Sequence, residues 1–191
     1  MHDPRTAEDR ANEGAARIRV RNPARLAGLV LLCAGAWLAG ANAACAGVNA
    51  GDAFPSLAAA NLTAATIPET AGKIVLVDFW ASWCAPCKAS FPAYSRLYSE
   101  FAARGLVIVA VSVDESPANY ESFVKRLAPA FPVALDKGQK LVRAVQVPTM
   151  PTSYLLDATG RVRYVHQGFH GAATEKALRE EIESLLSAKA P

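Results

Sequence analysis

Residues 74–88 read IVLVDFWASWCAPCK, and this stretch decides the fold. Residues 74–80 form a nearly continuous run of aliphatic, β-branched and aromatic residues, which is typical of a strand buried on both faces, as in a parallel sheet. A helical period begins at Ala85, so this strand is expected to run directly into a helix. Cys84 and Cys87 stand at the junction as a C-x-x-C motif. Such a motif between a strand and a helix indicates a redox-active cysteine pair.

The position of the two cysteines suits thiol chemistry. At the start of a helix, unpaired backbone N–H groups and the helix dipole stabilise negative charge. Cys84 is therefore expected to be exposed there and to favour the nucleophilic thiolate form. Cys87 lies one turn further in, where it is expected to be shielded and able to close a disulfide. Pro86 suits the first turn and stiffens the segment between the cysteines.

Two other uses of these cysteines are open from the residues alone. One is a structural disulfide, although such bridges rarely span only two intervening residues. The other is a zinc site, because His166 and His170 stand in H-x3-H spacing. The separation between Cys87 and His166 is far longer than in a zinc finger. We therefore expect no metal site and interpret both histidines as ordinary surface or strand-end residues.

Strands and helices alternate along the rest of the chain, which predicts an α/β sandwich. Pro92 is expected to kink the first helix, and Gly105 to end it. Residues 44–72 are expected to form an irregular lead-in with room for a hairpin. The later elements are expected to be a strand at 106–113, a helix opened by Ser116-Pro117 and ending at Leu127, a strand at 131–135, a helix at 139–145, strands at 152–156 and 162–165 around a hairpin turn at 158–160, and a closing helix with the apolar stripe Leu178, Ile182, Leu185 and Leu186.

The composition excludes several classes of protein. The chain has 191 residues, of which 52% are hydrophobic and 19% charged, so it is neither disordered nor a coiled coil. Its net charge of +3 comes from 20 basic and 17 acidic residues, and no basic stripe interleaves with aromatic residues. We therefore expect no nucleic-acid partner. Four cysteines in a chain of this length are too few for a disulfide scaffold.

The first 43 residues have the pattern of a secretory signal peptide. Four arginines within residues 17–25 precede an uncharged apolar segment at 26–41, and Ala41-Asn42-Ala43 is a small-x-small cleavage site. The predicted organisation is a signal peptide at 1–43 and one domain at 44–191. A retained membrane anchor is the alternative, although a spanning helix needs about 20 apolar residues.

Export would place the domain in the periplasm, an oxidising compartment in which thiols do not stay reduced unaided. Cys45 lies two residues after the cleavage site, so lipidation at Cys45 is a further alternative. We expect Cys45 to take no part in catalysis, because it precedes the folded domain.

Residues 77–88 resemble the active-site stretch of thioredoxins. A wider set of motifs is similar to the exported TlpA/ResA/CcmG-like branch of that family, and the resemblance covers roughly residues 50–188. These motifs are Gly72-Lys73, Phe91-Pro92, Val113-Asp114, Met150-Pro151-Thr152 and LLDATG at 155–160. The resemblance implies a thioredoxin-like three-layer sandwich with a mixed central sheet and flanking helices.

The resemblance also implies roles for individual residues. Pro151 would be the cis-proline beside the redox pair, with Pro148 as a competitor, and the backbone of Met150 would bind an extended substrate segment. Asp78 would be the buried carboxylate behind Cys87, which accepts a proton when Cys87 attacks. Trp83 would cover the exposed side of the dithiol and, with Pro86, contribute to substrate binding.

The sequence departs from the exported branch at two positions. Many members of that branch have Asn where Asp78 stands and Glu where Ser90 stands. The acidic group here therefore has the location found in thioredoxins.

The implied activity is that of an exported thiol–disulfide oxidoreductase with no bound cofactor beyond its Cys84–Cys87 pair. We expect a monomer that reduces disulfide-bearing exported clients and is recharged by a membrane thiol donor of the DsbD/CcdA type. Cytochrome c maturation is one process in which such a reductant would act. Ala85-Pro86 lacks the histidine that stabilises the thiolate of strong oxidants, which favours a reductant.

Two other functions are open. A peroxiredoxin-type thiol peroxidase shares the overall fold, but it needs Thr or Ser three residues before its reactive cysteine and Pro four residues earlier. Ala81 and Val77 occupy those positions. The other alternative is a non-catalytic binding module on a thioredoxin scaffold.

Overall fold

The computed structural model describes residues 47–188, so the expected signal peptide at 1–43 and Cys45 lie outside the described residues. No helix within the described residues is both long and apolar enough to cross a membrane. The elements in chain order are the 3₁₀ turn η1 (Ala58–Ala60), β1 (Ile74–Trp80), α1 (Ala85–Phe101), the 3₁₀ turn η2 (Ala102–Arg104), β2 (Leu106–Ser112), α2 (Pro117–Leu127), β3 (Val133–Leu135), α3 (Lys140–Val145), β4 (Thr152–Leu156), β5 (Val162–Gln167) and α4 (Ala172–Ala188).

The five strands form one mixed sheet in the order β3-β2-β1-β4-β5. β1 pairs in parallel with β2, and β2 with β3, whereas β4 is antiparallel to both β1 and β5. All seven residues of β1 are buried, because it has a strand on each side and a layer on each face. This burial explains its nearly continuous apolar sequence, and the mixed sheet confirms the predicted fold class.

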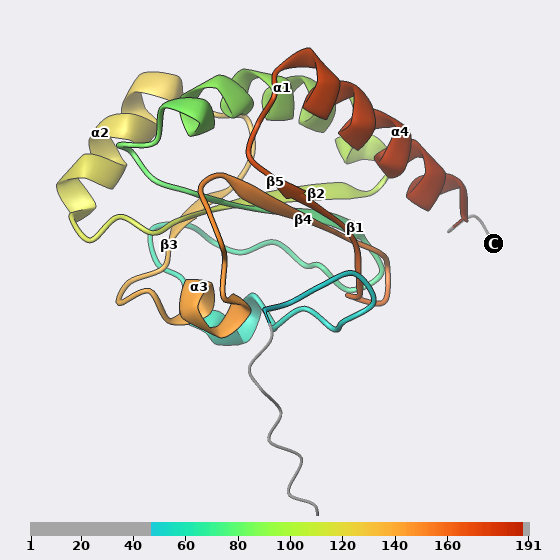
Figure 1. Cartoon of the computed structure of the whole chain (residues 1–191), viewed down its shortest axis with the longest axis horizontal. Helices are drawn as coiled ribbons and strands as arrows, with labels where there is room; N and C mark the ends of the chain where they lie inside the picture. The colour runs from blue at the N-terminus through green and yellow to red at the C-terminus, as the bar shows by residue number, and fades with distance from the viewer. Residues whose placement is uncertain (1–46, 189–191) are drawn as a thin grey trace, which may run out of the picture. The chain divides into compact units, whose positions relative to one another are not determined.

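The sheet lies between two layers of unequal size. Helices α1, α2 and α4 cover one face, and α3 and the lead-in at 47–72 lie on the other (Figure 1). Successive residues of β1 point to opposite layers. Trp80 packs against Phe91 of α1 and Phe123 of α2, with ring centroids 5.2 and 4.2 Å apart. Phe79 instead packs near Phe54 of the lead-in, at 6.5 Å.

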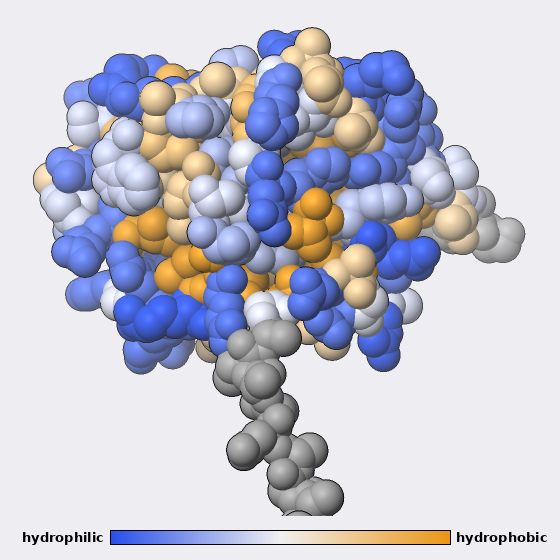
Figure 2. Space-filling view, in the orientation of Figure 1, coloured by the Kyte–Doolittle hydropathy of each residue, from blue (hydrophilic) through white to orange (hydrophobic). Residues whose placement is uncertain are grey.

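The surface of the domain reflects the amphipathic pattern of its helices. Helix α2 buries Tyr120 and Phe123 against the core, whereas its Lys125 and Arg126 are exposed. Figure 2 shows polar and weakly apolar residues mixed over the upper helices, and the most apolar residues mainly across the middle and lower part of this face.

The expectation of a hairpin in the lead-in is wrong. Within the described part of the lead-in, the bridging residues pair with distant segments: Ala53 with Arg161, and Thr63 with Leu135 of β3. Thr63 thereby covers the edge of β3, where the backbone groups would otherwise be unpaired. The lead-in closes the sheet at its edges instead of pairing with itself.

Several element boundaries also differ from the expected ones. β3 begins at Val133 rather than at 131, and Pro132, which lacks an amide hydrogen for a sheet ladder, directly precedes it. β5 continues two residues further than expected, to Gln167. Helix α1 passes through Pro92 and ends at Phe101, and η2 follows it.

Gly105 ends a helical segment as expected, whereas Ser116 does not cap α2 with its side chain. Gly105, with φ of 105°, ends η2 in the left-handed region that favours glycine, so the chain turns there as expected. Ser116 occupies the N-cap position of α2, but its side chain makes no capping hydrogen bond.

Candidate active site

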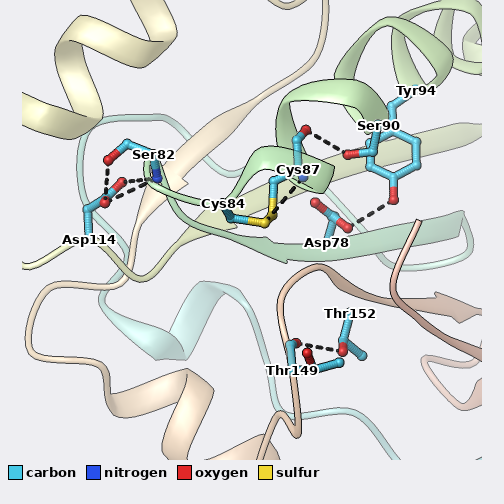
Figure 3. Close-up of a disulfide and its surroundings, with 9 residues drawn as sticks. All are labelled: Asp78, Ser82, Cys84, Cys87, Ser90, Tyr94, Asp114, Thr149 and Thr152. Atoms are coloured by element: carbon cyan, nitrogen blue, oxygen red, sulfur yellow. Dashed lines mark hydrogen bonds between the residues drawn. A yellow bond between two sulfur atoms is a disulfide. The ribbon is translucent and has the colours of Figure 1, made fainter. Parts of the chain in front are cut away.

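Cys84 and Cys87 form a disulfide at the junction of β1 and α1, with an S–S distance of 2.06 Å. Cys84 is the N-cap residue of α1 and has an extended backbone. The backbone N–H of Cys87 donates a hydrogen bond of 3.2 Å to Cys84 Sγ (Figure 3). A donor aimed at this sulfur also favours a thiolate there once the disulfide is reduced.

The exposure of the two cysteines corrects one expectation. Cys84 is 4% exposed and therefore buried in the disulfide form, and Cys87 is fully buried. Cys84 is more exposed than Cys87, as expected. However, Cys84 is far less exposed than we expect for a residue at the start of a helix.

Asp114 anchors the turn that carries Trp83 and Cys84. Its carboxylate accepts hydrogen bonds from the backbone N–H of Ser82, at 3.1 and 3.2 Å, and from the hydroxyl of Ser82, at 2.8 Å. The hydroxyl of Ser112 donates to the other oxygen, at 2.8 Å. The sequence placed Asp114 only within a family motif. Its partnership with Ser82 is not visible from spacing, because the two residues come from different strand ends.

The residues expected to bind substrate lie at the same end of the sheet. Thr152 is in register with Phe79 of β1, so the turn at Met150-Pro151 lies at the end of β1 that leads to the cysteines. The Met150–Pro151 peptide bond is cis. Pro151 is buried and Met150 half-buried, whereas Pro86 is exposed. Within residues 47–188, Trp83 is the one large hydrophobic side chain that is mostly exposed, at 70%.

Asp78 lies in the middle of β1, fully buried, on the face covered by α1. Its Oδ1 accepts a hydrogen bond of 3.0 Å from the hydroxyl of Tyr94, and its Oδ2 has no hydrogen-bond partner. Burial raises the pKa of the Asp78 carboxyl well above its usual value, against a smaller lowering by the Tyr94 hydrogen bond. Figure 3 draws this carboxyl between Cys87 and the Tyr94 ring.

Tyr94 and Ser90 are residues that the sequence reasoning did not place in the site. The helical period assigned Tyr94 to an apolar stripe, which is correct for its ring but not for its hydroxyl. A buried tyrosine usually has a partner for its hydroxyl, and this rule could have indicated one. Ser90 was noted only as a departure from the family, and its hydroxyl donates to the carbonyl of Cys87 at 2.9 Å.

The histidines of the zinc alternative do not lie in a ligand cluster. His166 Nε2 is 2.7 Å from Glu181 Oε2, and His170 is exposed. Over residues 47–188, no group of three or more His, Cys, Asp or Glu side chains is arranged to hold a metal ion.

Comparison with known sequences connects this site to thiol chemistry. The AhpC/TSA family model matches residues 50–165. A thiol-disulfide oxidoreductase ResA from Bacillus thuringiensis subsp. konkukian (strain 97-27) is 35% identical over 114 residues, which are 60% of this chain and 64% of that protein. Its counterpart from Halalkalibacterium halodurans is 33% identical over 115 residues, again 60% of this chain and 64% of that protein. The chain therefore spans less than two thirds of the length of these curated relatives.

A solved structure extends the similarity over a larger part of the chain. A candidate thiol:disulfide interchange protein DsbE from Chlorobium tepidum is 32% identical, with a TM-score of 0.64, and the match covers 73% of this chain and 99% of that one. StoA from Bacillus subtilis is 27% identical, with a TM-score of 0.51, over 58% of this chain and 82% of that one.

Proposed function

Because the chain belongs to the AhpC/TSA family, in its thioredoxin-like TlpA/ResA/CcmG group, we propose that it is a thiol–disulfide oxidoreductase that acts through Cys84 and Cys87. One observation carries the proposal: the disulfide caps α1, and the Cys87 amide donates to Cys84 Sγ. Cys84 also retains some exposed surface, whereas Cys87 has none. The dithiol itself holds the two electrons, so the exchange needs no bound cofactor.

The reaction consists of two exchanges. In the first, the Cys84 thiolate attacks a client disulfide, so that a Cys84–client bond forms and the client S–S bond breaks. In the second, the Cys87 thiol passes its proton to Asp78 and attacks Cys84 Sγ, which releases the client. The client is reduced to two thiols, and the protein is oxidised to the Cys84–Cys87 disulfide. The raised pKa of Asp78 suits it to accept this proton.

Clients are proposed to bind at the surface beside the disulfide. The exposed indole of Trp83 and the exposed ring of Pro86 offer apolar contacts next to Cys84. The backbone of Met150, before the buried Pro151, offers strand-like hydrogen bonds to an extended client segment. The clients are proposed to be disulfide-bearing exported proteins met by a monomer in the periplasm. A membrane thiol donor of the DsbD/CcdA type restores the dithiol.

The direction of electron flow is proposed to be reductive, because Ala85 and Pro86 supply no positive charge to stabilise the Cys84 thiolate. We expect a reduction potential nearer the roughly −270 mV of thioredoxin than the roughly −120 mV of strong oxidants. Equilibration with dithiothreitol or glutathione buffers, read by alkylation of free thiols, measures this potential. A value near the oxidising end would reverse the proposed direction.

Catalysed reduction of insulin by dithiothreitol tests the proposed function. The wild-type protein should accelerate insulin precipitation, and Cys84→Ala should not. Cys45→Ser should match the wild-type rate, since Cys45 precedes the domain. Failure of the wild-type protein to reduce insulin or any other protein disulfide would favour a non-catalytic binding module.

Thiol peroxidase activity is the second candidate, because the matching family model takes its name from AhpC and TSA. Ala81 and Val77 lack the hydroxyl and the proline that peroxidatic chemistry uses. Hydrogen peroxide consumption by the reduced protein should therefore not exceed that of a simple dithiol. Rapid consumption that depends on Cys84 would support the peroxidase instead.

A further inference from the structure

We infer that Tyr94 is a positioning residue that acts through Asp78, holding Oδ1 by a hydrogen bond so that the free Oδ2 accepts the proton of Cys87. The inference rests on the proposed function, in which the second exchange requires this proton to leave Cys87. Tyr94 itself touches neither the client nor the sulfur atoms in this scheme.

The two oxygens of the Asp78 carboxyl have different surroundings. The Tyr94 hydroxyl lies 3.0 Å from Oδ1, and both side chains are almost completely buried. Oδ2 is equally buried and has no hydrogen-bond partner. An unpartnered carboxylate oxygen is costly to bury, and this one lies on the side of the redox centre, where the proposed exchange needs a proton acceptor (Figure 3).

Helix α1 brings Cys87 and Tyr94 to the same side of Asp78. Cys87, Ser90 and Tyr94 are spaced by three and four residues, so they share the buried face of α1 that covers Asp78. The Ser90 hydroxyl is bonded to the Cys87 carbonyl at 2.9 Å. One helix face therefore presents both the thiol to be deprotonated and the hydroxyl that orients its acceptor (Figure 3).

The pKa of Asp78 is shifted by burial and by the Tyr94 hydrogen bond, with no charged side chain among the causes. In the register of the sheet, β2 places Ala110 and β4 places Ser153 opposite Asp78. The buried residues of α4 are Thr174, Leu178, Ile182, Leu185 and Leu186, none of which titrates. One strand further along the same face, β5 places His166 beside Ser153, and His166 Nε2 lies 2.7 Å from Glu181 Oε2 of α4. Tyr94 and Cys87 are the titratable groups next to Asp78 itself (Figure 3).

The hydrogen bond from Tyr94 changes the pKa of Asp78 in a definite direction. The Tyr94 hydrogen bond lowers the pKa of Asp78, against the raising by burial. Burial and the negative charge of Asp78 raise the pKa of the Tyr94 phenol well above its usual value, so Tyr94 remains a hydrogen-bond donor at neutral pH. Without this donor, Asp78 would be protonated over a wider pH range and could not accept the Cys87 proton there.

Tyr94→Phe is the variant that tests the inference. The titration of Asp78, followed by its carboxyl ¹³C shift in the oxidised protein, should move to higher pH. Resolution of a preformed Cys84 mixed disulfide should slow about tenfold at neutral pH, as expected for loss of one hydrogen bond to a charged group, and recover as the pH rises. Attack by Cys84 on a small disulfide should keep its rate.

Tyr120→Phe is the matched control. Tyr120 is also buried, and its hydroxyl donates at 2.6 Å to the carbonyl of Val133, away from Asp78. This variant loses the same atom and one hydrogen bond but should leave the Asp78 titration in place. In an Asp78→Asn background, Tyr94→Phe should cause no further slowing of resolution, because its effect passes through Asp78.

A second substitution keeps the inference testable if Tyr94→Phe does not fold. Incorporation of 3-fluorotyrosine at position 94, a stronger donor, should move the Asp78 titration to lower pH. An Asp78 titration unchanged by either substitution, or shifted equally by Tyr120→Phe, would overturn the inference. Because the titration uses oxidised protein without client, a wild-type protein inactive on disulfides would overturn the proposed function separately.

Discussion

Replacement of Cys87 by alanine is expected to convert a transient mixed disulfide into a stable covalent complex. Cys84 keeps its place at the start of α1, so the first exchange proceeds. The second exchange has no attacking sulfur, and the client stays bound to Cys84. Complexes with exported proteins should accumulate on non-reducing gels and disappear on addition of dithiothreitol. Mass spectrometry of the trapped species would identify the client.

Cys84→Ala is the matched control for this trapping. Cys87 is fully buried, and its sulfur is not at the helix cap, so this variant should trap little. Trapping through Cys87 in the Cys84→Ala protein, with none in the Cys87→Ala protein, would invert the proposed roles.

Asp78→Asn is expected to slow release of the client much more than formation of the mixed disulfide. Asparagine keeps the shape of the side chain and an oxygen for the Tyr94 hydrogen bond, but it cannot accept a proton at neutral pH. Loss of general-base assistance reduces a rate by about 10²–10⁴-fold. Rapid-quench alkylation separates the two steps. A normal rate of resolution together with a slowed attack by Cys84 would contradict this role.

The same variant is expected to change how the free energy of unfolding depends on pH. Because burial raises the pKa of Asp78, the native state binds this proton more tightly than the unfolded chain does. The contribution of Asp78 to the free energy of unfolding should therefore fall as the pH rises from the ordinary carboxyl pKa through the raised one. Asp78→Asn should remove this dependence and be the more stable protein above that range, as measured by denaturant titrations at several pH values.

The sequence was most informative where local pattern and burial coincide. The continuous apolar run of β1 could be recognised because a central parallel strand is buried on both faces. The C-x-x-C motif then placed the cysteines at the strand–helix junction. These two features indicate a central strand and the redox pair, whereas the mixed sheet was implied by the family resemblance.

The parts that sequence did not predict depend on partners distant along the chain. The lead-in pairs through Ala53 and Thr63 with the sheet, and no local pattern encodes those bridges. The helical period placed the ring of Tyr94 in the core but contained no information about Asp78, which lies on another element. The low exposure of Cys84 is likewise a property of the packed domain and not of its local sequence.

A single-turnover reaction of the reduced wild-type protein with a disulfide-bearing peptide tests the central claim most directly. The reaction is quenched with acid at successive times, and the products are mapped by mass spectrometry. We expect a peptide adduct on Cys84 that decays into the Cys84–Cys87 disulfide, with one peptide disulfide reduced per protein. An adduct on Cys87, or a peptide disulfide left intact by the reduced protein, would contradict the account.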